Sequence, residues 1–255
     1  MTKMRRGVAV LVVSVCLWAL GGPAAAATVL FDQGHGQMFT IDKDEPLHLA
    51  RLAGVFRQAG AEVQALSTSI DAEALAGIDV LVSSGPFRPF SPPEIAALEE
   101  FVEGGGRFVL MLHIAPPARG VLDRLGLAYS NGVVRERENV IGGNPLDFFV
   151  DDLATHPVTE GLETFALYGS WALRPRDERT APLARTSGRS WVDLDGDKKL
   201  GDADAVQAFV VAAHGSRGKG AFVVFADDAV FQNRFLEAQN LELAKNLARW
   251  ALTDE

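Results

Sequence analysis

The chain has 255 residues, and 33 acidic side chains against 24 basic ones give it a net charge of −9 at pH 7. An acidic chain without basic runs lacks the Lys/Arg surface that phosphate backbones require, so binding to nucleic acid is not expected. A single cysteine, Cys16, leaves little room for disulfide or thiol chemistry.

Residues 1–27 have the pattern of a secretory signal peptide. Lys3, Arg5 and Arg6 precede an apolar run at 7–20, and alanines at 24–27 form a small-residue cleavage site. We expect cleavage near Ala26 or Ala27, a periplasmic or secreted protein, and no stable membrane insertion after signal removal; a retained anchor is the alternative. The mature chain would have 21 basic and 33 acidic side chains and no thiol.

The first half of the mature chain alternates predicted strands and helices. Strands are predicted at 28–31, 62–66, 78–85 and 107–113, and helices at 46–58, at 91–104 and, more briefly, at 71–77. Ser91 is the expected N-cap of the 91–104 helix, with Glu94 completing a capping box. The strands are apolar without polar alternation, which is typical of a parallel sheet covered on both faces.

The rhythm changes in the second half. Short strand candidates separated by turns predict an antiparallel, β-rich elaboration at about 131–218, followed by a long strand within 220–228 and an amphipathic helix at 236–252. We therefore predict one domain, 28–255, with a three-layer, doubly wound α/β fold, a mainly parallel sheet and an elaboration in its second half.

Polar and glycine-rich segments follow the predicted parallel strands. In such folds, ligands bind beyond the carboxyl ends of the strands, so these segments are expected to border one crevice. The candidate ligand-binding residues are Asp32, Gln33, Gly34, His35, Gly36, Gln37, Ser84, Gly85, His113 and Asp227.

Three interpretations of this crevice remain open. It binds a neutral, small polar ligand; or Asp32, His35, His113 and Asp227 form a metal site or an acid/base catalytic set; or the histidines only fix the loops.

The segment WVDLDGDKKLGDAD carries a second candidate site. Asp193, Asp195, Asp197 and Asp204 occupy positions 1, 3, 5 and 12 of a calcium-loop pattern. Lys198 replaces the usual glycine at position 6, and Asp204 is shorter than the usual glutamate. The alternatives are a weak Ca²⁺ site and a solvated acidic turn.

Five segments together resemble a known family. They are VLFDQGHGQMF at 29–39, the long stretch from VLVSSG to LMLH at 80–113, HPVTEGL at 156–162, GKGAFVVFADDAVFQN at 218–233 and NLELAKNLARWAL at 240–252. The combination is similar to DUF4350-type proteins of the class I glutamine-amidotransferase-like superfamily. Trehalose-utilisation-type proteins and the amidotransferase-like domain of an intraflagellar-transport subunit are more distant relatives.

The resemblance implies a flavodoxin-like fold, and it also marks a departure. Amidotransferases of this superfamily carry a Gly-x-Cys-x-Gly elbow after the strand that here reads RFVLMLH, and this chain continues with Ile114. Without a thiol in the mature chain no acyl-enzyme can form, so glutamine amidotransferase activity is excluded.

Two hypotheses about function follow. The first is an exported, non-catalytic binding or accessory module, a degenerate amidotransferase-like domain that holds a small polar ligand such as a carbohydrate, or an envelope or transport protein. The alternative is a metal-assisted or acid/base hydrolase acting on glycosides or amides.

Overall fold

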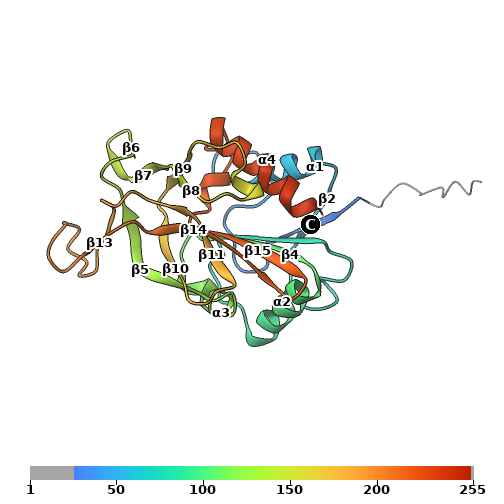
Figure 1. The fold of residues 1–255 in the computed structure, drawn as a ribbon. Coiled ribbons are helices and arrows are strands. Elements are labelled where there is room, and N and C mark those ends of the chain that lie inside the picture. The colour runs from blue at the N-terminus through green and yellow to red at the C-terminus, as the bar shows by residue number, and fades with distance from the viewer. Residues whose placement is uncertain (1–25, 254–255) are drawn as a thin grey trace, which may run out of the picture.

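The computed structural model describes residues 26–253 and has a mixed α/β fold built around one twelve-stranded sheet (Figure 1). The predicted signal peptide, apart from its last two residues, lies outside this range. Within 26–253, no helix has both the length and the apolar character needed to cross a lipid bilayer.

Five neighbouring strands of the sheet run parallel, in the order β15-β4-β3-β1-β2. They are β1 (Thr28–Asp32), β2 (Glu62–Leu66), β3 (Val80–Ser84), β4 (Arg107–Met111) and β15 (Gly220–Phe225). Nearly all residues of β1, β3, β4 and β15 are buried, because helices cover both faces. The strands predicted at these places are confirmed.

The prediction of a mainly parallel sheet is wrong, because seven further strands join the same sheet in antiparallel pairings. They are β5 (Leu127–Arg135), β8 (Asp152–Leu153), β10 (Trp171–Pro175), β11 (Thr180–Arg185), β12 (Trp191–Val192), β13 (Ala205–Val206) and β14 (Val210–Arg217). The physical reason is the β14–β15 hairpin, which extends the parallel sheet outward instead of starting a separate layer. Within the described residues, β6 (Val140–Ile141), β7 (Asn144–Val150) and β9 (Phe165–Tyr168) form a second, three-stranded sheet.

Helices pack on both faces of the parallel strands (Figure 1). One apolar cluster joins one face of the sheet to α1 (Ala50–Gln58) and α4 (Ala238–Leu252), and a second cluster joins the other face to α2 (Pro92–Gly104) and α3 (Arg119–Arg124). Short 3₁₀ helices are η1 (Pro116–Ala118), η2 (Pro157–Thr159) and η3 (Ala229–Phe231).

The helix predictions are confirmed in part. The capping box of α2 forms as predicted, since the Ser91 amide donates to the Glu94 carboxylate over 2.8 Å. The helix predicted from residue 46 begins only at Ala50, and residues 72–77 form turns instead of a helix. The short helix α3 was missed.

Candidate functional site

The segments that follow β1, β3, β4 and β15 lie together at the carboxyl edge of the parallel strands. The Ser83 hydroxyl donates to Asp32 over 2.7 Å, and the Gly85 amide donates to the carbonyl of Met111 over 2.8 Å. The Leu112 amide donates in turn to the carbonyl of Phe225 over 3.0 Å. The edge predicted to carry the site therefore exists, and the question is which of its side chains face outward.

The Asp32 carboxylate is the centre of a closed hydrogen-bond network. It accepts from the Gly34 amide at 2.9 Å and from the Gln37 side chain at 2.7 Å, in addition to Ser83. Nδ1 of His35 lies 3.0 Å from both of its oxygens. Asp32 is buried, and its lone pairs are occupied by groups of its own loop and of β3.

His35 is held between two carboxylates. Its Nε2 lies 3.2 Å from Glu94 while Nδ1 faces Asp32, and its ring stacks on Phe90 at a centroid distance of 4.0 Å. Burial lowers the pKa of His35, but the hydrogen bond to Asp32 and the charges of Asp32 and Glu94 outweigh burial and raise this pKa above its ordinary value. The geometry therefore favours a buried imidazolium that ties β1 to the start of α2.

The rest of the loop is fixed in the same way. The Gln33 side chain donates to Asp42 and accepts from the Ile41 amide, both over 3.1 Å. A Cβ at Gly34 would lie 2.2 Å from the carbonyl oxygen of Thr68, and Gly36 has φ of +73°. These glycines are required by close packing and backbone conformation. The polar side chains of this loop, which were predicted to bind a ligand, form hydrogen bonds with one another and with neighbouring segments.

His113 lies at this edge and reaches solvent. Its side chain is 41 % exposed, and Nδ1 lies 3.0 Å from Oδ1 of the buried Asp228. The hydrogen bond to Asp228 raises the pKa of His113 above its ordinary value, and this effect outweighs the lowering by partial burial. With Nδ1 facing Asp228, Nε2 is the ring atom left to meet a ligand.

Aromatic side chains surround His113. The rings of Phe39 and Phe87 lie 5.5 Å and 5.1 Å from the imidazole, centroid to centroid. The indole N–H of Trp171, from the antiparallel strand β10, donates to the His113 carbonyl over 3.2 Å. All three aromatic side chains are half-buried. We call His113, Phe39, Phe87 and Trp171 the aromatic surface.

Behind the aromatic surface lie two buried oxygens that have no hydrogen-bond partner in the described part of the chain, Oγ of Ser84 and Oδ2 of Asp228. Gly85 has φ of +59°, and a Cβ there would lie 2.6 Å from Oδ2 of Asp228 and 3.3 Å from Cβ of His113. Glycine is therefore needed to bring this backbone against the His113–Asp228 pair.

Asp227, which was predicted to face the crevice, does not. Its carboxylate is fully buried and accepts from the amides of Tyr168, at 2.6 Å, and Ala229, at 2.9 Å. Burial raises the pKa of Asp227 to about 7, and the charge of Asp228 adds to the increase. The carboxylate that faces His113 belongs to the next residue, Asp228. The chain turns into η3 at this point, so Asp227 accepts from backbone amides and Asp228 pairs with His113.

The metal version of the alternative catalytic set also fails on geometry. His35 is paired with Asp32 and Glu94, whereas His113 is paired with Asp228. Within the described residues, no three of Asp32, His35, His113 and Asp227 bring ligand atoms within 4.8 Å of one another. These four residues do not form one metal centre.

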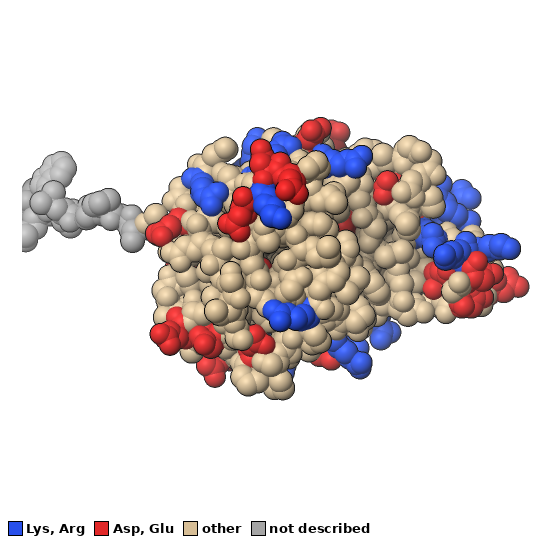
Figure 2. Space-filling model, turned by 180° about the vertical axis from the view of Figure 1, so that it is seen from behind, with Lys and Arg blue, Asp and Glu red and all other residues tan. Residues whose placement is uncertain are grey.

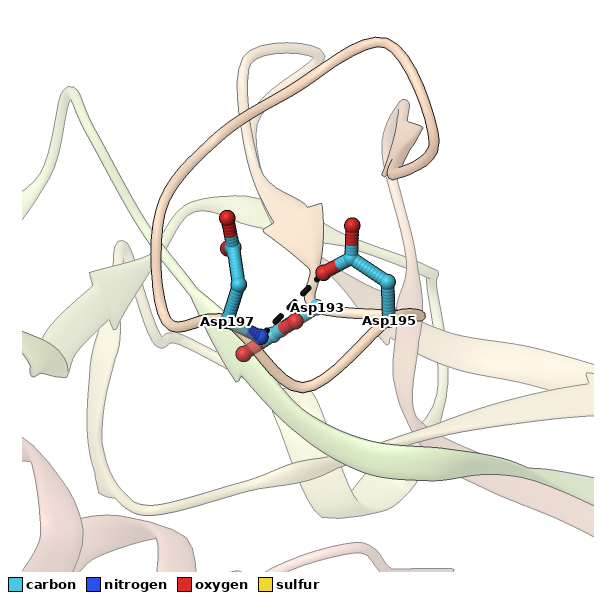
Figure 3. Close-up of side chains that lie close together, drawn as sticks. All are labelled: Asp193, Asp195 and Asp197. Carbon is cyan, nitrogen blue, oxygen red and sulfur yellow. Dashed lines mark hydrogen bonds between the residues drawn. The ribbon is translucent and has the colours of Figure 1, made fainter.

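Acidic side chains gather at the end of the molecule that carries β13 (Figures 1 and 2), where the chain forms the predicted calcium loop. The side chains of Asp193, Asp195 and Asp197 offer oxygens that all lie within 4.8 Å of one another (Figure 3). The Asp197 amide donates to Asp195 over 3.2 Å, the dashed contact in that view. Lys198 has φ of +64°, the left-handed conformation that the glycine of a calcium loop normally provides.

Asp204, predicted as the fourth ligand, is not part of this group. Its two oxygens accept from the Leu194 amide at 3.0 Å and from the Gly201 amide at 2.8 Å, so it closes the base of the loop. Its short side chain is the physical reason, because an aspartate at position 12 reaches the backbone but not the three other carboxylates.

Sequence reasoning missed several residues of the edge as site residues, namely Phe39, Phe87, Trp171, Asp228 and Glu94. Asp228 had a signal, since two adjacent aspartates follow β15. Glu94 was recognised as a capping residue, but its second contact, to His35, is long-range. Trp171 comes from a strand that was not predicted, so no local signal placed it near His113.

Comparisons with known proteins agree on the kind of fold. The model of a family described as "Domain of unknown function (DUF4350)" matches residues 44–248. No match was found among curated proteins.

Several solved structures are similar. One described as "mmIFT52 N-terminal domain" has a TM-score of 0.71 and 18% identity, covering 89% of this chain and 98% of that one. A putative ThuA-like protein from Bacteroides uniformis has a TM-score of 0.57 and 17% identity, covering 92% and 96%. A β-galactosidase from Rahnella sp. R3 has a TM-score of 0.54 and 15% identity; the match covers 89% of this chain but only 32% of that enzyme. At these identities the likeness concerns the fold alone.

Proposed function

The chain belongs to the DUF4350 family, and we propose that it is a non-catalytic, exported binding module whose aromatic surface holds a small polar ligand of the carbohydrate class. The observation that carries the proposal is the combination at one edge of a partly exposed His113, a buried carboxylate behind it and half-buried aromatic rings around it. Export rests on the signal-peptide pattern of residues 1–27.

The chemistry of the aromatic surface suits a sugar. The C–H faces of a pyranose pack on aromatic rings, and its hydroxyls need a small number of well-placed polar groups. Nε2 of His113 supplies such a group, and its position is fixed because Asp228 holds Nδ1 at 3.0 Å. A charged imidazole donates a stronger hydrogen bond to a hydroxyl oxygen than a neutral one does.

We further propose that the fold is a degenerate member of the class I glutamine-amidotransferase-like group, with flavodoxin-like layers. Support comes from the parallel strands with helices on both faces and from the likeness to ThuA-like proteins. In place of a thiol just after β4, this chain has His113 or Ile114. The change is consistent with a surface that binds without forming an acyl-enzyme.

The proposal is tested by titrating the protein with a panel of neutral monosaccharides and disaccharides, followed by calorimetry and by the imidazole resonances of His113. We expect saturable binding to at least one sugar, and about tenfold weaker binding in His113→Ala, the loss expected for a hydrogen bond from a charged group. His214→Ala, a half-buried histidine on the α4 face, is the matched control and should bind normally. The proposal fails if no sugar binds saturably, or if His113→Ala binds as well as the control.

The runner-up is an acid/base hydrolase acting on glycosides or amides. It is favoured by one observation, the His113–Asp228 pair, since a carboxylate that orients one ring nitrogen leaves the other to move a proton. Chromogenic aryl glycosides and anilides test it. If the wild type turns over one of these substrates and His113→Ala does not, the hydrolase hypothesis replaces the binding proposal. If the wild type and His113→Ala have equal turnover, the activity comes from a contaminant. If the wild type captures an envelope or transport protein that Phe87→Ala does not capture, the aromatic surface binds a protein partner instead.

We also propose that the loop of Asp193, Asp195 and Asp197 binds Ca²⁺. Three carboxylates within reach of one ion, and a left-handed residue at the sixth position, support it. The ion would clamp the loop and take no part in chemistry at the aromatic surface.

A further inference from the structure

A recess on the α4 face of the molecule is separate from the aromatic surface and from the calcium loop. It encloses about 660 Å³ and is lined by the segment at 153–162, which includes the HPVTEGL sequence, and by the last turns of α4. This volume is within the range of small-molecule sites, roughly 300–1,000 Å³. No residue of the aromatic surface or of the calcium loop lines the recess.

The charged side chains of the recess balance one another. Among the described residues that line it, these are Glu160 and Arg249, which lie 3.5 Å apart. Arg249 also lies 3.9 Å from Glu242 on α4. The lining therefore has no excess of positive charge for an anion, and a bound carboxylate would face the carboxylate of Glu160.

The histidines of this region add no charge at neutral pH. His156 lines the recess, and its ring lies 4.4 Å from that of His214, centroid to centroid. Burial, then the charges of His214 and Arg107, lower the pKa of His156 to about 4. Burial also lowers the pKa of His214. Both imidazoles are therefore uncharged at neutral pH.

Two N–H groups of the lining have no partner. Nδ1 of His156 accepts from the Val158 amide over 3.2 Å, so the proton of the neutral ring is on Nε2. Nε2 of His156 and Nε1 of Trp250 make no hydrogen bond within residues 26–253, and neither atom is fully buried. The two rings lie 6.0 Å apart, and both residues line the recess. A molecule in the recess can therefore accept from both.

Other polar side chains of the lining are already paired. The Asn246 side chain donates to the carbonyl of Glu160 over 2.7 Å and accepts from Arg249 over 3.0 Å. The Thr159 hydroxyl donates to the carbonyl of Ala154 over 2.6 Å. What the recess offers a ligand beyond these pairs is the donor capacity of the imidazole and the indole.

From this geometry we infer that the recess binds an uncharged small molecule with a carbonyl group, such as a carboxamide, whose oxygen accepts from Nε2 of His156 and Nε1 of Trp250. A carbonyl oxygen has two lone pairs, so one group can meet both donors. An ammonium group has no lone pair for either donor, and a carboxylate is disfavoured by Glu160. The inference is independent of the carbohydrate proposal, since no residue is shared.

The test uses the full chain and two amides, nicotinamide and benzamide, with nicotinate and benzoate as charged counterparts of the same shape. Binding is followed by the indole N–H resonance of Trp250 and the imidazole resonances of His156. We expect saturable shifts with at least one amide, and at least about tenfold weaker binding of its acid counterpart, which loses its hydration without gaining a cationic partner. Amide affinity should change little between about pH 6 and about pH 8, because His156 stays uncharged there.

Two variants each remove one donor. Trp250→Phe keeps an aromatic ring beneath Arg107 and removes the indole N–H. His156→Asp keeps an acceptor for the Val158 amide and removes the imidazole N–H. Each should weaken amide binding about three- to tenfold, the loss expected for one neutral hydrogen bond. Trp191→Phe is the matched control, since Trp191 is also 7% exposed but does not line the recess, and it should bind normally.

Three results would overturn the inference. They are no saturable shift of Trp250 with either amide, equal affinity for the amides and their acids, and wild-type affinity in both donor variants. Because Trp250→Phe leaves η2 unchanged, wild-type affinity in this variant overturns the role of the indole even where His156→Asp is destabilised.

Discussion

Replacing His35 with glutamine removes the buried cation that links Asp32 to Glu94. In the wild type the two ring nitrogens lie 3.0 Å and 3.2 Å from these carboxylates, with side chains that are almost fully buried. Breaking a buried ion pair by removing one partner costs about 3–5 kcal/mol. We expect the lower end, about 3 kcal/mol, because both carboxylates keep other donors: Asp32 keeps Gly34, Gln37 and Ser83, as found above.

In a domain of this size, each kcal/mol lowers the melting temperature by about 2–4 °C, so His35→Gln should melt about 6–12 °C below wild type. Differential scanning calorimetry measures this directly. His48→Gln is the control, because His48 is also buried but its carboxylate neighbour, Glu45, is mostly exposed.

The pH dependence of this difference follows from the raised pKa of His35. A group whose pKa is higher in the folded state stabilises fully below its unfolded pKa, about 6.5, and loses this contribution as the pH rises through the folded value. The difference between wild type and His35→Gln should therefore be largest near about pH 6 and shrink as the pH rises through the folded pKa of His35. A difference under about 1 kcal/mol, or one that does not shrink with rising pH, would refute a buried imidazolium at this position.

Three further predictions concern other parts of the chain. Gly85→Ala should lower the free energy of unfolding in urea by about 1–3 kcal/mol, because the Gly85 backbone is left-handed and the new Cβ would lie 2.6 Å from Oδ2 of Asp228. An unchanged free energy of unfolding would contradict this close contact. Glu136→Gln should cost about 2–4 kcal/mol in the same assay, because the buried carboxylate accepts from three amides and two hydroxyls, and the amide cannot accept all of them. Calorimetric titration with Ca²⁺ should give one site with a dissociation constant of about 10⁻⁴–10⁻³ M that is lost in Asp193→Ala; equal heats from both proteins would leave only a solvated acidic loop.

The parallel part of the fold could be predicted because its signals are local. Buried strands such as Val80–Ser84 read as uninterrupted apolar runs, and the start of α2 is marked by Ser91 and Glu94. The sheet as a whole could not be predicted in the same way. The β14–β15 hairpin joins the antiparallel strands to the parallel ones, and no local pattern indicates that they share a sheet.

The candidate site shows the same division. The edge was predictable from strand order, because side chains that follow parallel strands meet there. Which side chains face outward was not, since it depends on contacts between distant segments. His35 is turned inward by Glu94, which lies 59 positions further along, and Asp227 is turned inward by the Tyr168 amide. A histidine between glycines looked like a ligand-binding turn, but it is a buried link between elements.

The central claim is that the carboxyl edge of the parallel strands binds ligand through His113 while the Asp32–Gln37 loop only supports it. The most direct measurement is the imidazole resonance of His113 during a titration with the best-binding sugar, in wild type and in Asp228→Asn. We predict a saturable shift in the wild type and about tenfold weaker binding in the variant, with His35 unaffected in both. A sugar that binds without moving the His113 resonance, or that moves the His35 resonance instead, would contradict the account.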